Sequence, residues 1–199
     1  MCLLLESIKV VNRKFVNLHL HQARVDRSLA ELGIGEEKIS LTEMLGILED
    51  LSDGVYKCRV IYGREIQKVE FIPYGPAPLT TLKLVHDDKI DYHLKFADRR
   101  CISSLMELRG GCDDILIVKN GFITDTSYCN ILFFDGSHWL TPDTPLLSGT
   151  QRQHLLELGK VNAAGIRVED LRYFQHFMVV NAMLDFDEQR ALPLGNIVL

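Results

Sequence analysis

One continuous stretch, Ile115 to Phe134 (ILIVKNGFITDTSYCNILFF), constrains the fold more than any other part of the chain. It reads as two apolar strands joined at Asn120-Gly121, because an Asn-Gly pair accepts the positive φ angles of a type I′ hairpin turn. Polar residues interrupt its second half: Thr124, Asp125, Thr126, Ser127 and Asn130. Polar groups at the depth of a sheet are usually hydrogen-bonded to backbone, water or a ligand. Taken alone, the pattern fits a polar sheet edge or barrel rim as well as it fits a binding site.

Composition and charge exclude several classes of protein. The 199 residues suffice for one large domain or two small ones, and 47% hydrophobic with 25% charged residues is typical of soluble globular proteins. A net charge of −5 argues against nucleic acid as a partner, since phosphate binding needs a basic face. The sequence contains no apolar run long enough to span a bilayer, and its start, MCLLLESIKVV, lacks the features of a secretory signal. We expect a cytoplasmic protein that binds neither membrane nor nucleic acid.

The cysteines and histidines give no sign of a disulfide framework or a metal site. The five cysteines are scattered without CxxC spacing: Cys2, Cys58, Cys101, Cys112 and Cys129. His19 and His21 are too close together to share a helix face, and no Cys or carboxylate completes a ligand set around them. We therefore expect reduced thiols and no metal.

A proline-rich segment, Pro73–Pro78, divides the sequence. Three prolines and one glycine in this segment exclude a helix and disfavour a central strand. We therefore predict a first domain at residues 1–75 and a second domain at 76–199.

The expected elements indicate an α+β fold. The first domain reads as strands 3–11, 55–62 and 65–74, with helices near His21 and from the capping box Ser40–Glu43 to Leu51. The second domain is rich in strand patterns, with helices expected from Asp98 to Leu108 and from Thr150 to Leu158.

Two further features could carry chemistry. Lys95 lies between the apolar Leu94 and Phe96, and desolvation of a lysine makes its neutral, nucleophilic amine available. Ser148–Arg152 joins a loop to a helix start at Gly149, where backbone N–H groups and the helix dipole favour an anion. Neither feature is specific by itself, so their order along the chain matters more.

This order, a lysine at a strand end, an acidic hairpin and a glycine-led helix start, resembles the class IV aminotransferase family, the fold-type IV pyridoxal-phosphate enzymes. Leu4–Ile8 resembles the family's FET-I strand, and His21–Arg24 its H-x-x-R helix. Leu94-Lys95 matches the position of the cofactor lysine. The hairpin Gly121–Phe133 resembles G-x-(V/I)-T-E-x-x-x-x-N-I-F, and Leu147–Arg152 resembles L-P-G-I-T-R.

The resemblance implies a fold and a set of site residues. The fold is α+β in two domains, a small N-terminal α/β domain and a larger barrel-like C-terminal domain that carries the lysine. The cofactor is pyridoxal 5′-phosphate. Lys95 would bind it covalently and move protons at the substrate's α carbon. Asp125 would pair with its pyridine nitrogen. The other cofactor-binding residues would be Arg24, Gly149, Thr150 and Gln151 at the phosphate, and Asn181 near the family's second phosphate loop.

Two departures from the family's motifs and one similarity to a group within the family bear on the function. Asp125 replaces the family's usual glutamate, and Gln151 replaces its usual threonine. Lys95–Arg99 is similar to the K-x-x-N-R pattern of 4-amino-4-deoxychorismate lyases. We therefore expect a lyase that converts 4-amino-4-deoxychorismate to 4-aminobenzoate and pyruvate, on the route to folate.

Two other interpretations stay open. The first is an aminotransferase for branched-chain or D-amino acids, and the second is a catalytically impaired relative that binds the cofactor. In each case the ligand would be a small amino-acid-like molecule, and the resemblance implies a homodimer.

Overall fold

A computed structural model describes residues 2–34, 38–46 and 51–199, and the chain divides into two compact units. Unit 1 contains Met1–Pro76 together with Leu94–Asp98, and unit 2 contains Ala77–His93 and Arg99–Leu199. The division after Pro76 falls within the proline-rich segment.

The segment around Lys95 departs from the expectation that the C-terminal domain carries it, because it groups with unit 1. The reason is a pair of backbone hydrogen bonds to the start of the chain. The N–H of Leu5 donates to the carbonyl of Lys95, and the N–H of Ala97 donates to the carbonyl of Leu3, each at 2.9 Å. Phe96 also forms an isolated antiparallel bridge with Leu4.

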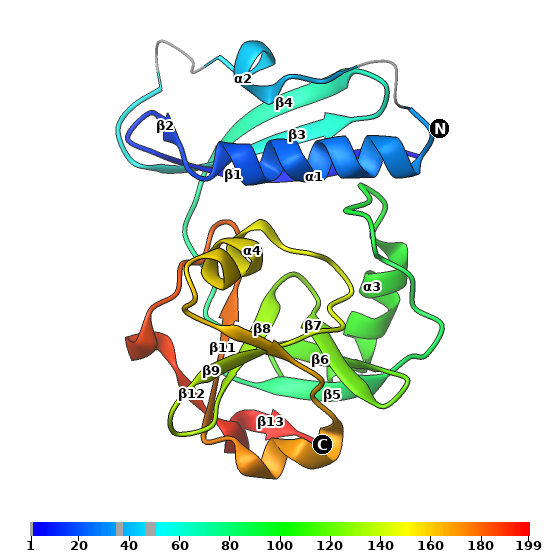
Figure 1. Ribbon diagram of the computed structural model, residues 1–199, viewed down its shortest axis with the longest axis vertical. Coiled ribbons are helices and arrows are strands. Elements are labelled where there is room, and N and C mark those ends of the chain that lie inside the picture. The colour runs from blue at the N-terminus through cyan, green and yellow to red at the C-terminus, as the bar shows by residue number, and fades with distance from the viewer. Residues whose placement is uncertain (1, 35–37, 47–50) are drawn as a thin grey trace. The chain divides into compact units, whose positions relative to one another are not determined.

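Unit 1 is built on an antiparallel sheet with strand order β2-β1-β3-β4. The strands are β1 (Leu4–Val11), β2 (Lys14–Phe15), β3 (Val55–Tyr62) and β4 (Ile66–Pro73). Helix α1 (Leu18–Glu31) runs along this sheet (Figure 1), and its Val25 and Leu29 enter the same core as Leu4 and Ile8. Gly33, with φ +70°, follows the end of this helix, where glycine accepts the left-handed conformation.

The predicted second helix is shorter than expected. Helix α2 covers Leu41–Met44, and the Oγ of Ser40 accepts a hydrogen bond from the N–H of Glu43 at 3.3 Å, as a capping box predicts. Leu45 is already extended. Of the remaining predicted helix, residues 47–50 lie outside the described residues.

Unit 2 contains a sheet of nine strands in the described part of the chain. The central path runs β10-β9-β8-β7-β6-β5-β13, and β11 pairs with β8 and β12. The strands are β5 (Leu82–His86), β6 (Asp114–Lys119), β7 (Phe122–Thr126), β8 (Asn130–Phe134), β9 (Trp139–Pro142), β10 (Asn162–Ala164), β11 (His176–Val180), β12 (Leu192–Pro193) and β13 (Ile197–Val198). Its two α-helices are α3 (Arg100–Met106) and α4 (Thr150–Glu157), and its 3-10 helices are η1 (Glu107–Arg109), η2 (Val168–Tyr173), η3 (Glu188–Arg190) and η4 (Leu194–Asn196).

The hairpin at the centre of the sequence argument is β6–β7, and β8 continues it antiparallel to β7. Asn120 and Gly121 both have positive φ angles, +53° and +80°, as a type I′ turn requires. The polar residues that follow the turn are buried, so they do not form an exposed sheet edge. Helix α3 begins at Arg100 with Arg99 as its N-cap, and not at the expected cap Asp98.

Two kinds of feature are absent from the described residues. Within the described ranges, no helix is long and apolar enough to cross a membrane. The same residues contain no group of three or more His, Cys, Asp or Glu side chains that could hold a metal ion.

Candidate active site

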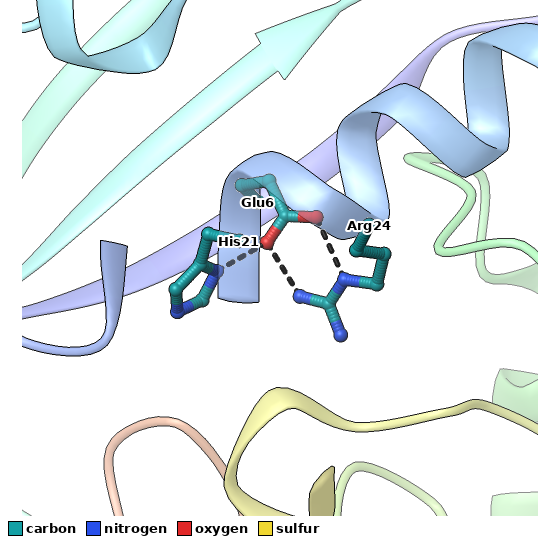
Figure 2. A network of polar contacts seen from close by, with 3 residues as sticks. All are labelled: Glu6, His21 and Arg24. Carbon is teal, nitrogen blue, oxygen red and sulfur yellow. Dashed lines mark hydrogen bonds and ion pairs between the residues drawn. The ribbon is translucent and has the colours of Figure 1, made fainter. Parts of the chain in front are cut away.

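Unit 1 contains a buried carboxylate in an otherwise apolar row. Side chains alternate across a strand, so Glu6 shares the core face of β1 with Leu4, Ile8 and Val10. Its side chain is fully buried, and its hydrogen-bond partners come from α1 (Figure 2). These partners are His21 and Arg24, which lie three residues apart and therefore face the same side of the helix.

The three side chains are linked by hydrogen bonds and an ion pair (Figure 2). Arg24 donates from Nε to Oε1 of Glu6 at 2.8 Å and from Nη2 to Oε2 at 2.5 Å. The Nδ1 of His21 lies 2.6 Å from the same Oε2. Burial alone would raise the pKa of Glu6, but the charge of Arg24 and the hydrogen bonds from both partners outweigh it and lower that pKa to about 2. Glu6 is therefore ionised near neutral pH.

His21 is neutral in this arrangement. Burial lowers its pKa, and the charges of Arg24 and Lys95 add to this effect against the opposing influence of Glu6. Because a carboxylate can only accept a hydrogen bond, Nδ1 is the ring nitrogen that carries the hydrogen. The influence of Lys95 on His21 also means that the lysine's charge lies close to this cluster. Lys95 itself is half-buried, and its neighbour Leu94 packs in the core of unit 1.

Unit 2 contains a second buried carboxyl group, that of Asp125, with an exposed fraction of 5%. Its Oδ1 accepts a hydrogen bond from Nδ2 of Asn130 at 2.7 Å, and its Oδ2 accepts one from the backbone N–H of Leu147 at 2.9 Å. Burial raises the pKa of Asp125 to about 6, and these hydrogen bonds and the charge of Arg152 only partly oppose that effect. Asp125 is thus an acid whose protonation is balanced near neutral pH.

Asn130 connects this acid to the start of α4. Its Nδ2 also donates to the carbonyl of Leu147 at 2.9 Å. A Cβ on Gly149, the N-cap residue of α4, would meet Oδ1 of Asn130 at 1.9 Å, so only glycine fits there. The first two residues of the helix, Thr150 and Gln151, are both buried. Backbone N–H groups at such a helix start are suited to bind an anion.

Arg152 braces this region from the side. Its Nη2 donates to the carbonyl of Pro142 at 2.8 Å, and its Nε donates to Oγ1 of Thr141 at 3.3 Å. The burial of Arg152 lowers its pKa. Its guanidinium therefore holds the β9 end of the loop and contributes positive charge near Asp125.

Asn181 directly follows Val180, the Cα partner of Asn130, and its side chain is occupied by local contacts. Its Oδ1 accepts from the backbone N–H groups of Met183 and Leu184, at 2.8 Å and 3.0 Å, and its Nδ2 donates to Sγ of Cys129 at 3.1 Å. These bonds close the turn that follows β11. The cofactor contact expected for Asn181 stays a prediction.

Three further residues of the site lie within the sequence motifs but have no role predicted from the sequence: Glu6, His21 and Asn130. A signal for Glu6 was present, since a carboxylate in the apolar row of β1 requires a buried partner. For Asn130 the signal was its position opposite Asp125 after a tight turn, where the two residues are Cα partners. The structure brings Glu6, His21, Arg24 and Lys95 together in unit 1, and Asp125, Asn130 and the Gly149 loop together in unit 2.

Comparisons with known proteins agree with these features. Residues 93–186 match the model of the amino-transferase class IV family. A protein of Haemophilus influenzae described as uncharacterized is 38% identical over 183 residues, which cover 90% of this chain and 97% of that protein. A crystal structure from Haemophilus somnus, provisionally described as a 4-amino-4-deoxychorismate lyase, is 33% identical with a TM-score of 0.86, covering 94% of this chain and 98% of that one.

A more distant structure, the pyridoxal-phosphate-bound form of a hypothetical aminotransferase from Mycobacterium tuberculosis, shares the fold. It is 17% identical with a TM-score of 0.78, covering 98% of this chain and 81% of that one. The chain belongs to the amino-transferase class IV family, and its fold is that of the family's fold-type IV pyridoxal-phosphate enzymes.

The residues of this chain fit the family's cofactor. A protonated pyridine nitrogen needs a buried acid, and Asp125 is one, held by neutral hydrogen-bond donors. A phosphate is suited to the backbone N–H groups at a helix start, and Gly149, as the N-cap residue of α4, precedes such a start.

Proposed function

We propose that this protein is a pyridoxal-phosphate-dependent lyase that converts 4-amino-4-deoxychorismate to 4-aminobenzoate and pyruvate. The observation that carries the cofactor part of the proposal is the buried Asp125, whose pKa near 6 suits an acid opposite a ring nitrogen. The lyase part is supported by the 33% identity to the Haemophilus somnus protein over nearly the whole length of both chains. It is also supported by the spacing of Lys95 and Arg99, with Nη2 of Arg99 bonded to the carbonyl of Ser127 beside the Asp125 hairpin.

Each residue has a defined task. Arg24 and the backbone N–H groups of Thr150 and Gln151, at the helix start that Gly149 opens, bind the cofactor phosphate. Asp125 holds the proton at the pyridine nitrogen through a carboxylate oxygen. Lys95 is the residue to which the cofactor is covalently bound. When bound, the cofactor supplies an electron sink for negative charge at the substrate's α carbon.

The proton chemistry falls to Lys95. Once the substrate amine has taken the place of Lys95 on the cofactor, the released Nζ would remove the proton from the ring carbon that carries this amine. The C–O bond at the neighbouring carbon then breaks, and the enolpyruvyl group leaves with the bonding electrons and is protonated to pyruvate. The remaining ring becomes aromatic as 4-aminobenzoate. No oxidant or reductant is required.

The first experiment tests the cofactor. Purified protein is mixed with pyridoxal 5′-phosphate, and its visible absorbance is recorded before and after reduction with borohydride. We expect a protein-bound absorbance band and, after reduction, a covalent label on Lys95 in the peptide map. Protein that gains no band and no label on Lys95 would refute the enzyme interpretation.

A second experiment separates the lyase from an aminotransferase for branched-chain or D-amino acids. The Mycobacterium tuberculosis relative is described as an aminotransferase. The holoenzyme is incubated with aminodeoxychorismate alone, and in parallel with amino acids and 2-oxoglutarate. We expect 4-aminobenzoate without any keto acid. Amino transfer to 2-oxoglutarate without 4-aminobenzoate would instead establish the aminotransferase.

The replacement of the usual glutamate by Asp125 and of the usual threonine by Gln151 favours one more alternative, a cofactor-binding relative with impaired catalysis. The same two assays recognise it, because it would bind the cofactor at Lys95 and turn over none of the substrates.

A further inference from the structure

Binding of the cofactor phosphate by Arg24 does not by itself explain why Glu6 is buried beside this residue. A carboxylate with no exposed surface stands in the apolar row of β1 and is fully ionised. A buried ion pair is rarely the most stable choice, because well-packed apolar residues of the same volume are often equally stabilising or more so. Glu6 therefore calls for an explanation beyond the stability of unit 1.

The geometry around Arg24 gives that explanation. Two of the three guanidinium nitrogens, Nε and Nη2, are bonded side-on to the two oxygens of Glu6. Figure 2 shows that the third nitrogen, Nη1, points away from Glu6. A guanidinium held at two points on one edge cannot rotate, so the direction of its opposite edge is fixed as well.

His21 fixes the other partner in this pair. Its Nδ1–H donates to Oε2 of Glu6, the oxygen that also accepts from Nη2 of Arg24. The Glu6 carboxylate therefore accepts three hydrogen bonds from α1, and it cannot turn without breaking at least one of them. Because His21 is neutral, Glu6, His21 and Arg24 together carry no net charge. The attraction of these three side chains for an anion therefore depends on how Arg24 is oriented.

We propose that Glu6, supported by His21, is a positioning residue for phosphate recognition: it holds Arg24 so that the Nη1 edge of the guanidinium is preset to bind the phosphate of the cofactor. The proposal rests on the proposed function, because it assumes that pyridoxal 5′-phosphate is the ligand. Orientation before binding saves the rotamer freedom that a long side chain would otherwise lose on contact. Glu6 thus contributes to affinity although its own charge repels a phosphate.

Orientation and charge predict opposite changes in affinity for the phosphate, so the direction of the change tests the proposal. The variant Glu6→Gln raises the net charge of the cluster by one. If charge alone decided phosphate affinity, this variant would bind pyridoxal 5′-phosphate more tightly. If orientation decides it, the variant binds more weakly, because a glutamine amide accepts only one of the two hydrogen bonds that hold Arg24.

The experiment measures dissociation constants of pyridoxal 5′-phosphate and of pyridoxal, which lacks the phosphate but has the same aldehyde to react with Lys95. For Glu6→Gln we expect affinity for pyridoxal 5′-phosphate to fall by roughly tenfold, the scale of one immobilised side chain and one charge-assisted hydrogen bond. Affinity for pyridoxal should stay unchanged. The matched control is Glu70→Gln, also in unit 1, where the carboxylate forms ion pairs with Arg59 and Lys68 at the surface.

A double-variant cycle tests whether Glu6 acts through Arg24. In an Arg24→Gln background, Glu6→Gln should cause no further change in the ratio of the two dissociation constants. If Glu6→Gln fails to fold, Glu6→Asp replaces it, because it keeps the charge but is one methylene too short to maintain both bonds to Arg24. We expect the same loss of selectivity for the phosphorylated ligand.

Three results would overturn the inference. They are tighter binding of pyridoxal 5′-phosphate by the Glu6 variant, an unchanged ratio of the two constants, and an equal loss for both ligands, which would mean a purely structural role. Failure of the proposed function gives a different result, since the unaltered protein would then bind neither ligand at Lys95.

Discussion

The two units each bury one carboxyl group of the candidate active site, and the two groups behave in opposite ways. Glu6 in unit 1 has a pKa lowered to about 2, whereas Asp125 in unit 2 has a pKa raised to about 6. Burial raises the pKa in both cases, so burial does not explain the difference. The difference between the two pKa values comes instead from the charge of the hydrogen-bond donors. Glu6 is bonded to a guanidinium, while the donors to Asp125 are neutral, namely the amide of Asn130 and backbone N–H groups.

This difference suits two different tasks. The charge of Glu6 is already compensated by Arg24, so Glu6 can position another residue without drawing in further cations. The charge of Asp125 is not compensated by the groups that bond to it, so the site favours a positively charged partner. A protonated pyridine nitrogen is such a partner, in agreement with the proposed function.

The largest expected effect concerns Glu6, the carboxylate that is hydrogen-bonded to a charged guanidinium. Glu6→Gln leaves the buried guanidinium of Arg24 without its counter-charge, and breaking a buried ion pair in this way costs about 3–5 kcal/mol. We expect a loss of that order in the free energy of unfolding, measured by urea denaturation near pH 7. Because the pKa of Glu6 is lowered from 4.5, its contribution is present above about pH 4.5 and is lost as pH falls through about 2.

The control for this measurement is Glu70→Gln, whose partly exposed ion pairs should contribute at most about 1 kcal/mol. A Glu6→Gln variant as stable as the unaltered protein would mean that the pair is not the stabilising contact the geometry indicates.

The next effect concerns Asp125, the carboxyl group whose hydrogen-bond donors are neutral. The pKa of Asp125 is higher in the folded state than its ordinary value of 3.8, so the folded state binds more protons between about pH 4 and 6. Stability attributable to Asp125 therefore falls as pH rises through this window, by at most roughly 3 kcal/mol at about 1.4 kcal/mol per pKa unit. Urea denaturation of the cofactor-free protein and of Asp125→Asn at several pH values measures it.

We expect the stability of the unaltered protein, relative to Asp125→Asn, to decline from pH 4 to pH 6 and then to level off. A relative stability that is flat over this window would show that Asp125 titrates at its ordinary pKa, and the contrast with Glu6 would be lost.

A third test removes one of the neutral donors. Gly149→Ala places a Cβ against Oδ1 of Asn130, so the amide must move and break its bonds to Asp125 and to the Leu147 carbonyl. We expect a loss of about 1–3 kcal/mol in unfolding free energy and a further rise in the pKa of Asp125. Gly195→Ala is the matched control, since a Cβ there meets nothing within 4 Å. Equal effects of the two substitutions would contradict the role given to Asn130.

The sequence predicted most of the local structure, because the signals for it are local. The Asn120-Gly121 turn, strand β3 after Gly54 and helix α4 after Gly149 were all expected from neighbouring residues. The grouping of the Lys95 segment with unit 1 was not predictable in this way. It depends on backbone hydrogen bonds to Leu3 and Leu5, far away in the sequence, and such pairing leaves no local pattern.

The residues of the candidate site also differ in whether the sequence could predict them. Asp125 and the Gly149 loop could be found because a resemblance to known motifs pointed to them. The fork between Glu6 and Arg24 could not, because its partners are 18 residues apart and a strand pattern does not say what a buried carboxylate faces. The pKa of Asp125 also depends on donors from β8 and the Leu147 loop, and the geometry of those donors appears only in the fold.

The smallest expected effect concerns Arg152, the cation whose charge lowers the pKa of Asp125. Its guanidinium bonds to Thr141 and to the Pro142 carbonyl, so its charge acts on Asp125 without being one of the donors described above. Arg152→Gln should therefore raise the pKa of Asp125 by less than the loss of the Asn130 amide does, as seen in the midpoint of the pH-dependent difference from Asp125→Asn. Arg152→Lys keeps the charge and loses the guanidinium bonds, so it should leave that midpoint in place. If both substitutions shift the midpoint equally, Arg152 acts by bracing β9, and the contrast between the two carboxyl groups rests on direct donors alone.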